Sequence, residues 1–513
     1  MNSFLTIIRS AAKQAAYLLL FPLFFVLHGY NENFGVISWI IVAKLLLGYC
    51  LISSVIFICT IILFRDNNKG FLLAFVCLCL FFFFGSLHDY VNFSLGKTFG
   101  SYSVLLTLLF LILTSAVIAI KVSGKRRISA ASRYVKWLLL LFLIIEAAIF
   151  LYKSAWPQEI RGAALPVHGI KKKPQKNNGK PDIFLVVFDG YTSSACLKSD
   201  FGFDNASIDS VLVAHHFFVS RSSKSNYNLT PFSLGSFFNS SYLKVDSQDY
   251  VIRHKDLLSA ANTVKYNWIV PFLQTKGYVV KNLGVFDFNT CPVMTYQYFG
   301  EDYYSAAIDN QTIISRVKRD IAWNFTIRNP LTGSFTVPRY YSEEKERYIA
   351  RNQFNYDQFT QELAKTSEKP RFVYCHLMLP HEPYYFKADG SLTSDTDIIL
   401  RRINDKAGYL NQIGYSNLLL KTIIGLSDLK QKRNRIVIIM GDHGFRSYPS
   451  KKYRPKTFCN LNCIYSSDGD SELYDGISPI NTFRFVLNRY FGQSLPFLKD
   501  SSTYLVDPVY DSR

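Results

Sequence analysis

Long apolar segments fill the first third of the chain, and shorter ones recur through the rest. Most of the long segments approach the ~20 residues that a helix needs to cross a bilayer. These segments are Ala15–Leu27, Ala43–Phe64, Phe71–Phe84, Val104–Ile120 and Trp137–Tyr152. The stretch VLHGYNENF at the end of the first segment lacks a small-x-small cleavage site, which favours a retained span over a signal peptide. We therefore predict about five transmembrane helices over residues 1–153.

The charges between these segments predict how the chain is oriented. The N-terminus and the loops RDNNKG and KVSGKRRISAASRYVK are basic, whereas the loops around Glu32 and Asp89 are not. Because cytoplasmic loops carry the excess of Lys and Arg, the N-terminus is expected in the cytoplasm and the chain after Tyr152 outside it. The net charge is +19, and residues 1–181 hold 19 Lys+Arg against 5 Asp+Glu. The basic excess thus belongs to the membrane part, and we exclude nucleic acid as a partner.

The pattern changes after the last long segment. Residues 154–181 are polar, basic and proline-containing, as in a linker. Residues 182–513 then alternate apolar, β-branched or aromatic runs with stretches of helical spacing, such as YLNQIGYSNLLLKTIIGLSDL. The expected strands are Asp182–Gly190, Gly277–Phe286, Arg371–Leu379 and Arg435–Asp442. Near-continuous apolar strands alternating with helices predict an α/β domain, with a mostly parallel sheet covered by helices on both faces.

The cysteines divide between the two parts of the chain. Four lie in the long apolar segments, where thiols behave as small apolar groups, and five lie in the expected outer domain. The stretch CNLNC, Cys459 to Cys463, is compatible with a small disulfide in an oxidising compartment and equally with two unpaired thiols. The sequence assigns no partners.

Polar side chains with metal-binding atoms stand at the ends of three expected strands. Asp189 ends the first strand, HLMLPHEPYYF supplies His376 and His381, and Asp442 and His443 end the last. In a parallel sheet these ends meet at one edge, where sites form. Each residue alone has a plain structural explanation, in a turn or a buried core, but together they favour a site. A mixed oxygen and nitrogen set suits Zn²⁺ or Mn²⁺ better than Ca²⁺.

A candidate nucleophile lies in SKSNYNLTPFSLGSFFN. Thr230-Pro231 before an apolar-periodic run predicts a helix start, with Thr230 at the N-cap and the proline at the first helical position. Thr230 could simply cap this helix. The same geometry also presents N–H groups to an anion, and a metal-bound hydroxyl there would be prepared to attack phosphorus or sulfur.

Four motifs resemble a known family in content and in order. They are DIFLVVFDGYTSS, SNYNLTPFSL, HLMLPHEPYYF and IIMGDHG. They resemble the membrane-anchored, sulfatase-like branch of the alkaline phosphatase superfamily, which includes lipoteichoic acid synthases and phosphoethanolamine transferases. Members of that branch likewise have about five N-terminal spans and an extracytoplasmic catalytic domain. The resemblance extends over nearly the whole chain, including SPINTFRFVLNRYFG near its end.

The resemblance implies roles for individual residues. Asp189, Asp442 and His443 would hold one divalent metal, with Zn or Mn preferred and Mg or Ca as alternatives. Thr230 would be both metal ligand and nucleophile. His381, in PHEPY, matches the histidine that engages the phosphate of the substrate or assists the leaving group.

The match also has weaker points. His376 receives only a substrate-binding role, and the first acidic ligand, Asp189, is often Glu in the transferases. Formylglycine-type sulfatases carry a C/S-x-P-S-R motif, but here the sequence is TPFSL, with no cysteine to oxidise and no arginine after it. Aldehyde-hydrate chemistry is therefore excluded, and the threonine favours phosphoryl chemistry through a phospho-enzyme.

Three functions follow from these observations. The first is a metal-dependent enzyme that moves a phospho-alcohol from a phospholipid donor to a glycan or lipid acceptor at the cell surface. The second is a hydrolase of sulfate or phosphate esters that uses water as the acceptor. The third is a membrane structural protein with an inactive site, which the four intact motifs disfavour. The resemblance implies a multi-pass protein of the bacterial inner membrane whose catalytic domain faces the periplasm, and it leaves the oligomeric state open.

Overall fold

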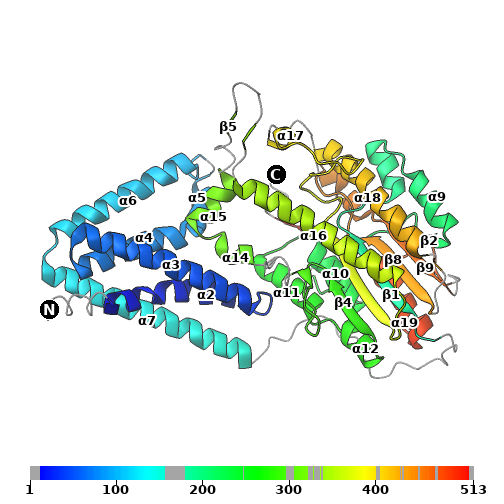
Figure 1. The fold of residues 1–513 in the computed structure, drawn as a ribbon, viewed down its shortest axis with the longest axis horizontal. Coiled ribbons are helices and arrows are strands. Elements are labelled where there is room, and N and C mark those ends of the chain that lie inside the picture. The colour runs from blue at the N-terminus through cyan, green and yellow to red at the C-terminus, as the bar shows by residue number, and fades with distance from the viewer. Residues whose placement is uncertain are drawn as a thin grey trace. The chain divides into compact units, whose positions relative to one another are not determined.

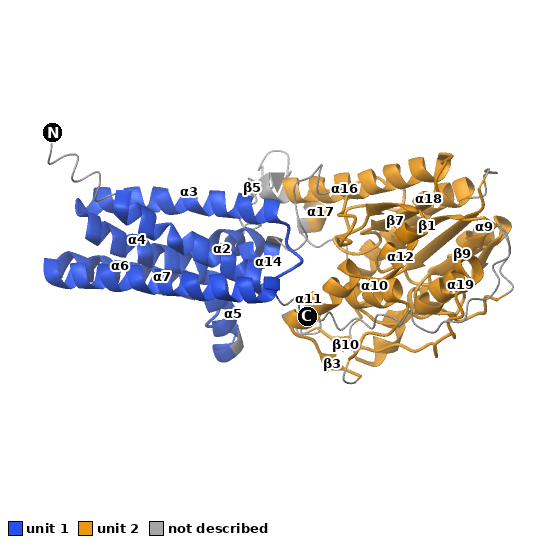
Figure 2. Ribbon diagram, turned by 90° about the horizontal axis from the view of Figure 1, so that it is seen from below, with its two compact units in different colours: residues 1–158, 301–326 blue, residues 159–300, 327–513 orange. Residues whose placement is uncertain are grey.

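Figure 1 shows the fold of residues 1–513 in a computed structural model. The structure describes residues 12–96, 98–155, 179–245, 248–295, 305–321, 327–328, 335–336, 339–399, 405–427, 429, 433–448, 451–467 and 472–507. The chain divides into two compact units, shown in different colours in Figure 2. Unit 1 comprises residues 1–158 and 301–326, and unit 2 comprises residues 159–300 and 327–513. Most of the expected linker, residues 156–178, lies outside the described residues.

Unit 1 is a bundle of apolar helices. Its elements are α2 (Leu20–Glu32), α3 (Trp39–Phe64), α4 (Asn67–Phe82), α5 (Phe84–Leu95), α6 (Tyr102–Val122), α7 (Lys125–Ala155), α14 (Ser305–Asp309) and α15 (Ile313–Asp320). Within the described residues, four helices are long and apolar enough to cross a membrane. The count rises to five if the bent pair α4 and α5, which meet at 52°, is one span. This pair covers the expected third segment, and the other four segments each coincide with a long helix.

Polar contacts inside unit 1 satisfy groups that a bilayer would not. The buried carboxylate of Glu146 on α7 accepts a hydrogen bond from Asn31 Nδ2 at 2.7 Å and lies 2.8 Å from His28 Nδ1. Asn31 and His28 are both on α2. A buried charge is tolerated in such surroundings because partners of this kind compensate for its lost hydration.

Residues from a distant part of the sequence join this bundle. Helices α14 and α15 pack against α2, α3, α4 and α5. The buried Arg316 on α15 donates two hydrogen bonds to the carboxylate of Asp89 on α5, at 2.7 and 2.5 Å. The hydroxyl of Tyr102 on α6 donates to Asp320 at 2.6 Å. Residues 301–326, which lie between two segments of unit 2 in the sequence, are therefore an integral part of unit 1.

Unit 2 is built on a six-stranded sheet with the order β2-β9-β8-β1-β7-β4. These strands are β1 (Asp182–Phe188), β2 (Phe217–Val219), β4 (Val279–Leu283), β7 (Arg371–Leu377), β8 (Arg435–Gly441) and β9 (Asn462–Ser466). Strands β8, β1, β7 and β4 are mutually parallel, whereas β9 and β2 add antiparallel pairs at one edge. Short strand pairs lie outside this sheet: β3 (Tyr250–Val251) with β10 (Leu505–Val506), and β5 (Ile327–Arg328) with β6 (Phe335–Thr336).

Helices cover both faces of the sheet, as the sequence predicted. The helices of unit 2 are α8 (Ser194–Cys196), α9 (Ala206–Ala214), α10 (Thr230–Asn239), α11 (His254–Lys265), α12 (Ile269–Thr275), α16 (Arg339–Ala364), α17 (Asp395–Ile399), α18 (Asp405–Ser427) and α19 (Pro479–Phe491), with the π-helix η1 (Leu197–Phe201) and the 3₁₀-helix η3 (Lys451–Phe458). The four predicted strands are β1, β4, β7 and β8, each shortened at one or both ends, and the predicted helix before β8 is α18.

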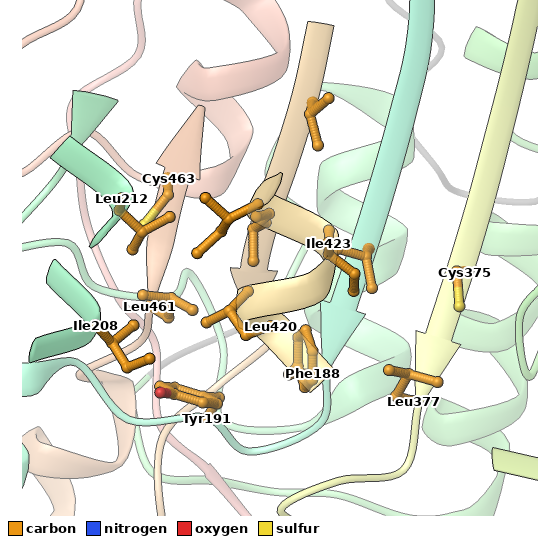
Figure 3. Close-up of a cluster of buried hydrophobic side chains, with 14 of the residues drawn as sticks. Phe188, Tyr191, Ile208, Leu212, Cys375, Leu377, Leu420, Ile423, Leu461 and Cys463 are labelled. Carbon is orange, nitrogen blue, oxygen red and sulfur yellow. The ribbon is translucent and has the colours of Figure 1, made fainter. Parts of the chain in front are cut away.

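Alternation along the central strands separates two apolar layers. Val186 and Phe188 of β1 and Leu377 of β7 face α18, whose Leu420 and Ile423 pack in the same buried cluster (Figure 3). The opposite face carries Phe372 and Tyr374, whose rings contact Phe238 of α10. Because side chains alternate along a strand, His376 falls on this second face, the one that α10 covers.

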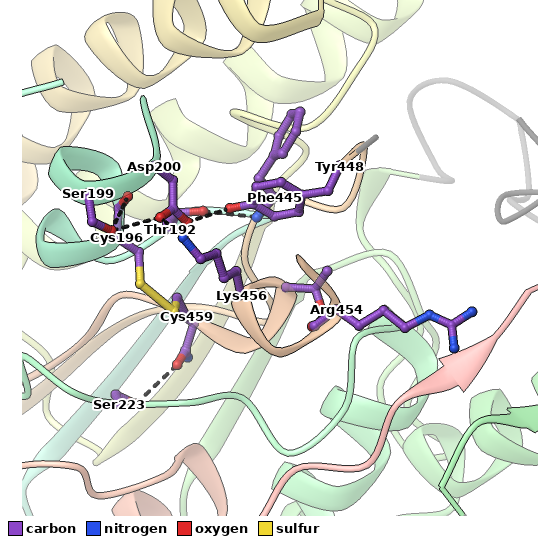
Figure 4. Close-up of a disulfide and its surroundings, with 12 residues drawn as sticks. Thr192, Cys196, Ser199, Asp200, Ser223, Phe445, Tyr448, Arg454, Lys456 and Cys459 are labelled. Carbon is purple, nitrogen blue, oxygen red and sulfur yellow. Dashed lines mark hydrogen bonds and ion pairs between the residues drawn. A yellow bond between two sulfur atoms is a disulfide. The ribbon is translucent and has the colours of Figure 1, made fainter. Parts of the chain in front are cut away.

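A disulfide joins two loops that follow β1 and β8. Cys196, in α8, is bonded to Cys459, just after η3 (Figure 4). Cys463 is a free, buried thiol on β9. Neither alternative for CNLNC was therefore right, because the partner of Cys459 comes from a segment 263 residues away.

Candidate metal and phosphoryl-transfer site

The first two side chains of the candidate site come from neighbouring parallel strands. In the register of β1 and β8, Phe188 lies opposite Gly441, so Asp189 and Asp442 follow at the same edge. Gly190 has φ of +74°, and its N–H donates to Asp442 Oδ1 at 3.0 Å. This bond fixes the Asp442 carboxylate and leaves its Oδ2 atom directed at the site.

The first histidine is held by its other ring nitrogen. His443 Nδ1 lies 2.7 Å from the carbonyl oxygen of Gly444, which requires the proton on Nδ1 and leaves the Nε2 lone pair free. His443 Nε2 lies 3.4 Å from Asp189 Oδ1 and 3.5 Å from Asp442 Oδ2. The imidazole thus presents the atom that binds metals between two carboxylates.

The second histidine enters from β7. His376 is 1% exposed, and its Nε2 lies 3.3 Å from Asp189 Oδ2. Its Nδ1 lies 3.1 Å from the hydroxyl of Tyr374, which can either accept or donate. Asp189, His376 and Asp442 form a group whose ligand atoms all lie within 4.8 Å of one another.

Unpaired atoms at this point fit a cation. Asp189 Oδ1, Asp442 Oδ2 and His443 Nε2 are buried and have no hydrogen-bond partner among the described residues. Buried acceptors that face one another are costly unless a positive charge lies between them. Two carboxylates and two imidazoles are the donor set of a transition metal such as Zn²⁺ or Mn²⁺. The described residues therefore fit one divalent ion.

The site favours the protonation states that bind metal. Burial alone would raise the pKa of the Asp189 carboxyl, but the imidazoles of His381, His376 and His443 together hold it well below its usual range. Burial lowers the pKa of His443, against the opposing effect of the Asp442 carboxylate. At neutral pH the site therefore offers a charged carboxylate and a neutral imidazole.

Thr230 is the first residue of α10, with Leu229 at the N-cap and Pro231 in the first turn. The predicted N-cap position was therefore one residue too late. Thr230 is half-buried. Within the described residues its hydroxyl makes no hydrogen bond, whether to the four candidate ligand side chains or to any other group. The hydroxyl is thus not used for capping.

Hydrogen bonds connect the segment before α10 to the loops that carry the site. Ser225 N donates to the carbonyl of Phe458 at 2.7 Å, and Ser223 Oγ donates to Asn460 Oδ1 at 3.1 Å. Asn460 Nδ2 in turn donates to the carbonyl of Gly441 at 2.7 Å, directly before Asp442. The helix that begins at Thr230 is therefore anchored through one loop to the end of β8.

A cavity beside the four side chains holds the remaining predicted residue. His381 and His443 both line it, with their ring centroids 6.3 Å apart. Arg446 also lines this cavity and places Nη2 2.6 Å from His381 Nε2. Sequence reasoning gave Arg446 no role, although it is the last residue of RIVIIMGDHGFR. Arg446 could have been predicted from its charge and from its position in the sequence, four and three residues after Asp442 and His443.

Residues 223–463 match the family model described as Sulfatase. This region of the chain is similar to the sulfatase family. The matched region includes Thr230, His376, His381, Asp442 and His443, and it begins after Asp189. A search of curated protein sequences finds no match.

Solved structures with a similar domain are distant. The C-terminal periplasmic domain of EcEptC from Escherichia coli is 10% identical, covers 62% of this chain and 86% of that chain, and has a TM-score of 0.34. The C-terminal periplasmic domain of phosphoethanolamine transferase EptC from Campylobacter jejuni is 16% identical over 62% and 91%, with a TM-score of 0.33. The soluble domain of lipooligosaccharide phosphoethanolamine transferase A from Neisseria meningitidis is 12% identical over 64% and 92%, also at 0.33. Likenesses of this degree assign no reaction and no substrate to unit 2.

Proposed function

We propose that this protein is a membrane-anchored, metal-dependent enzyme that cleaves or transfers phosphate-ester groups through Thr230. The observation that carries the proposal is the convergence of three unpaired buried ligand atoms, from Asp189, Asp442 and His443, at one edge of the sheet. No structural role in the described residues accounts for them. A threonine at the start of a helix that is anchored to the same edge supplies the nucleophile.

The proposed ligands are Asp189, His376, Asp442 and His443, with Thr230 as the further ligand that the resemblance implies. A bound divalent ion would lower the pKa of a coordinated hydroxyl and stabilise charge on the ester oxygens. His376 thus changes from the predicted substrate-binding role to a proposed ligand, because its Nε2 lies beside Asp189.

The residues of the chain perform the remaining tasks. Thr230 Oγ1 forms the bond to phosphorus as the bond from phosphorus to the leaving alcohol breaks, and the helix N–H dipoles at Thr230 favour the anionic group. The hydroxyl loses one proton and the leaving oxygen gains one, and we assign the transfer of this proton to His381. An acceptor hydroxyl, or water, then attacks the same phosphorus and releases Thr230.

The helices of unit 1 favour a lipid donor, because a lipid is reached from the membrane surface. We therefore infer a phospholipid as donor and a glycan or lipid at the cell surface as acceptor. The disulfide between Cys196 and Cys459 supports an oxidising compartment for unit 2, such as the periplasm of a bacterium whose inner membrane holds unit 1.

Sulfate-ester hydrolysis is the second candidate, and the match to the sulfatase family model favours it. The discriminating experiment incubates the detergent-solubilised full chain with p-nitrophenyl phosphate, a p-nitrophenyl phosphodiester and p-nitrophenyl sulfate. Release from the phosphorus esters supports the main proposal, whereas release from the sulfate alone supports the second candidate.

The nucleophile is tested in the same preparation. We expect Thr230→Ala to abolish turnover and Thr230→Ser to retain part of it, while the exposed Thr275→Ala serves as a control and leaves turnover unchanged. Intact mass after brief exposure to substrate should show a phosphoryl adduct in the native chain and none in Thr230→Ala. Full turnover by Thr230→Ala would refute the assignment, and no turnover of any ester by metal-loaded protein would favour an inactive structural role.

A further inference from the structure

The contact between Arg446 and His381 fixes how both side chains meet the cavity. His381 Nδ1 lies 2.7 Å from the carbonyl oxygen of Glu382, so the proton belongs on Nδ1. Nε2 then carries the lone pair, and it accepts a hydrogen bond from Arg446 Nη2 at 2.6 Å. The Arg446 guanidinium is therefore hydrogen-bonded to Nε2, the nitrogen that the proposed reaction needs for proton transfer.

The backbone of Arg446 is held firmly on both sides. Phe445 N donates to Thr192 Oγ1 at 2.9 Å, and the buried Phe445 ring packs against Tyr409 and Tyr448, with centroids 4.7 and 5.2 Å away. Tyr448 N donates to the carbonyl oxygen of Arg446 at 2.8 Å. The start of the side chain is thus fixed beside the cavity, while its long stem allows the guanidinium to change partner.

The charges around the site call for a further cation. The carboxylates of Asp189 and Asp442 would together neutralise one divalent ion, so the ion would leave little net positive charge for an anionic substrate. Among the residues that line the cavity, all of which the structure describes, Arg446 is the one with a permanent positive charge. Its planar fork matches two oxygens of a phosphate group, which a lysine does not.

We propose that Arg446 binds the non-bridging oxygens of the anionic ester and, in doing so, leaves His381 Nε2 free to accept the proton of the Thr230 hydroxyl and pass it to the leaving oxygen. This inference rests on the proposed function and adds a residue that selects for a negatively charged group. When the substrate binds, Arg446 exchanges its hydrogen bond to the neutral His381 Nε2 for one to an anionic oxygen of the ester. The new bond is the stronger one, because both of its partners are charged.

Binding of inorganic phosphate to the metal-loaded full chain in detergent tests the proposal without turnover. Calorimetric titration should give a dissociation constant about 10- to 100-fold higher for Arg446→Gln than for the native protein. Arg446→Lys keeps the positive charge but loses the planar pair of N–H donors, so its dissociation constant should lie between those of the native protein and Arg446→Gln. Lys452→Gln removes an exposed positive charge on the neighbouring loop and should leave phosphate binding unchanged.

Metal content and thermal unfolding of each variant show whether the site is intact. A folded, metal-loaded Arg446→Gln protein that binds phosphate with native affinity would overturn the proposal, and Arg446 would then only hold His381 in place. An equal loss of affinity in Lys452→Gln would also overturn it, because general surface charge would then explain the effect. The phosphate titration needs no Thr230 chemistry, so its failure is distinguishable from failure of the proposed function.

Discussion

His376 Nε2 lies 3.3 Å from Asp189 Oδ2, and both side chains are buried at the ends of adjacent parallel strands. The register of β1 and β7 creates this relationship, since Val187 lies opposite His376. We therefore proposed His376 as a metal ligand rather than as a substrate-binding residue.

We predict that His376→Ala lowers the affinity for Zn²⁺ or Mn²⁺ by at least about tenfold. Removing a residue that only hydrogen-bonds to a metal ligand already has an effect of this size. The bound metal in purified full-length protein, measured by elemental analysis after dialysis, checks this. The exposed His216→Asn serves as the control and should keep its metal. If His376→Ala retained metal at the native level and lost only substrate affinity, the substrate-binding role implied by the resemblance would be correct.

Gly441 is required by the close approach of two backbone segments directly before Asp442. A Cβ atom there would lie 2.4 Å from the carbonyl oxygen of Tyr191, a backbone atom with little freedom to move. We predict that Gly441→Ala destabilises unit 2 by about 1–3 kcal/mol, as overpacking does, and weakens metal binding as well.

Gly425, in α18, gives the matched comparison because a Cβ atom there meets nothing within 4 Å. Gly425→Ala should be neutral or should stabilise the helix by up to about 1 kcal/mol. Thermal unfolding of both variants decides the matter, and equal unfolding midpoints would show that the contact at Gly441 is relieved by a backbone shift.

The disulfide between Cys196 and Cys459 closes a loop of 263 residues and joins the segments that follow two proposed ligands. Long closed loops restrict the unfolded chain most, so we predict that Cys196→Ser costs about 2–5 kcal/mol. The native protein with reductant should unfold at the same lowered temperature. The variant Cys291→Ser, at a free thiol, is the control. An unfolding temperature of Cys196→Ser equal to that of the native chain would contradict the expected stabilisation.

Much of unit 2 was predictable because its central strands are continuous apolar runs and most of the proposed ligands directly follow them. The hydrophobic pattern locates β1, β7 and β8, and the rule that parallel strands share an edge brings Asp189 and Asp442 together. His376 was harder to assign, because it lies inside a strand and only the register of β7 against β1 places it beside Asp189.

Other features depend on contacts between distant segments that no local pattern reports. Cys459 had a nearer candidate partner in sequence, yet the loops that follow β1 and β8 bring Cys196 to it. The position of Arg446 against His381 depends on how the loop after β8 folds back over Thr192. The spacing of apolar residues also gave no sign that α14 and α15 pack with the apolar helices of unit 1.

That last segment has a consequence for how the two units are connected. The chain passes from one unit to the other three times, near residues 158, 300 and 326. Cutting a single site introduced between residues 165 and 176 therefore should not liberate a soluble fragment. The C-terminal piece carries α14 and α15 with it, so it should sediment with the membranes and respond to detergent. Appearance of that piece in the supernatant would mean that these two helices do not hold it there.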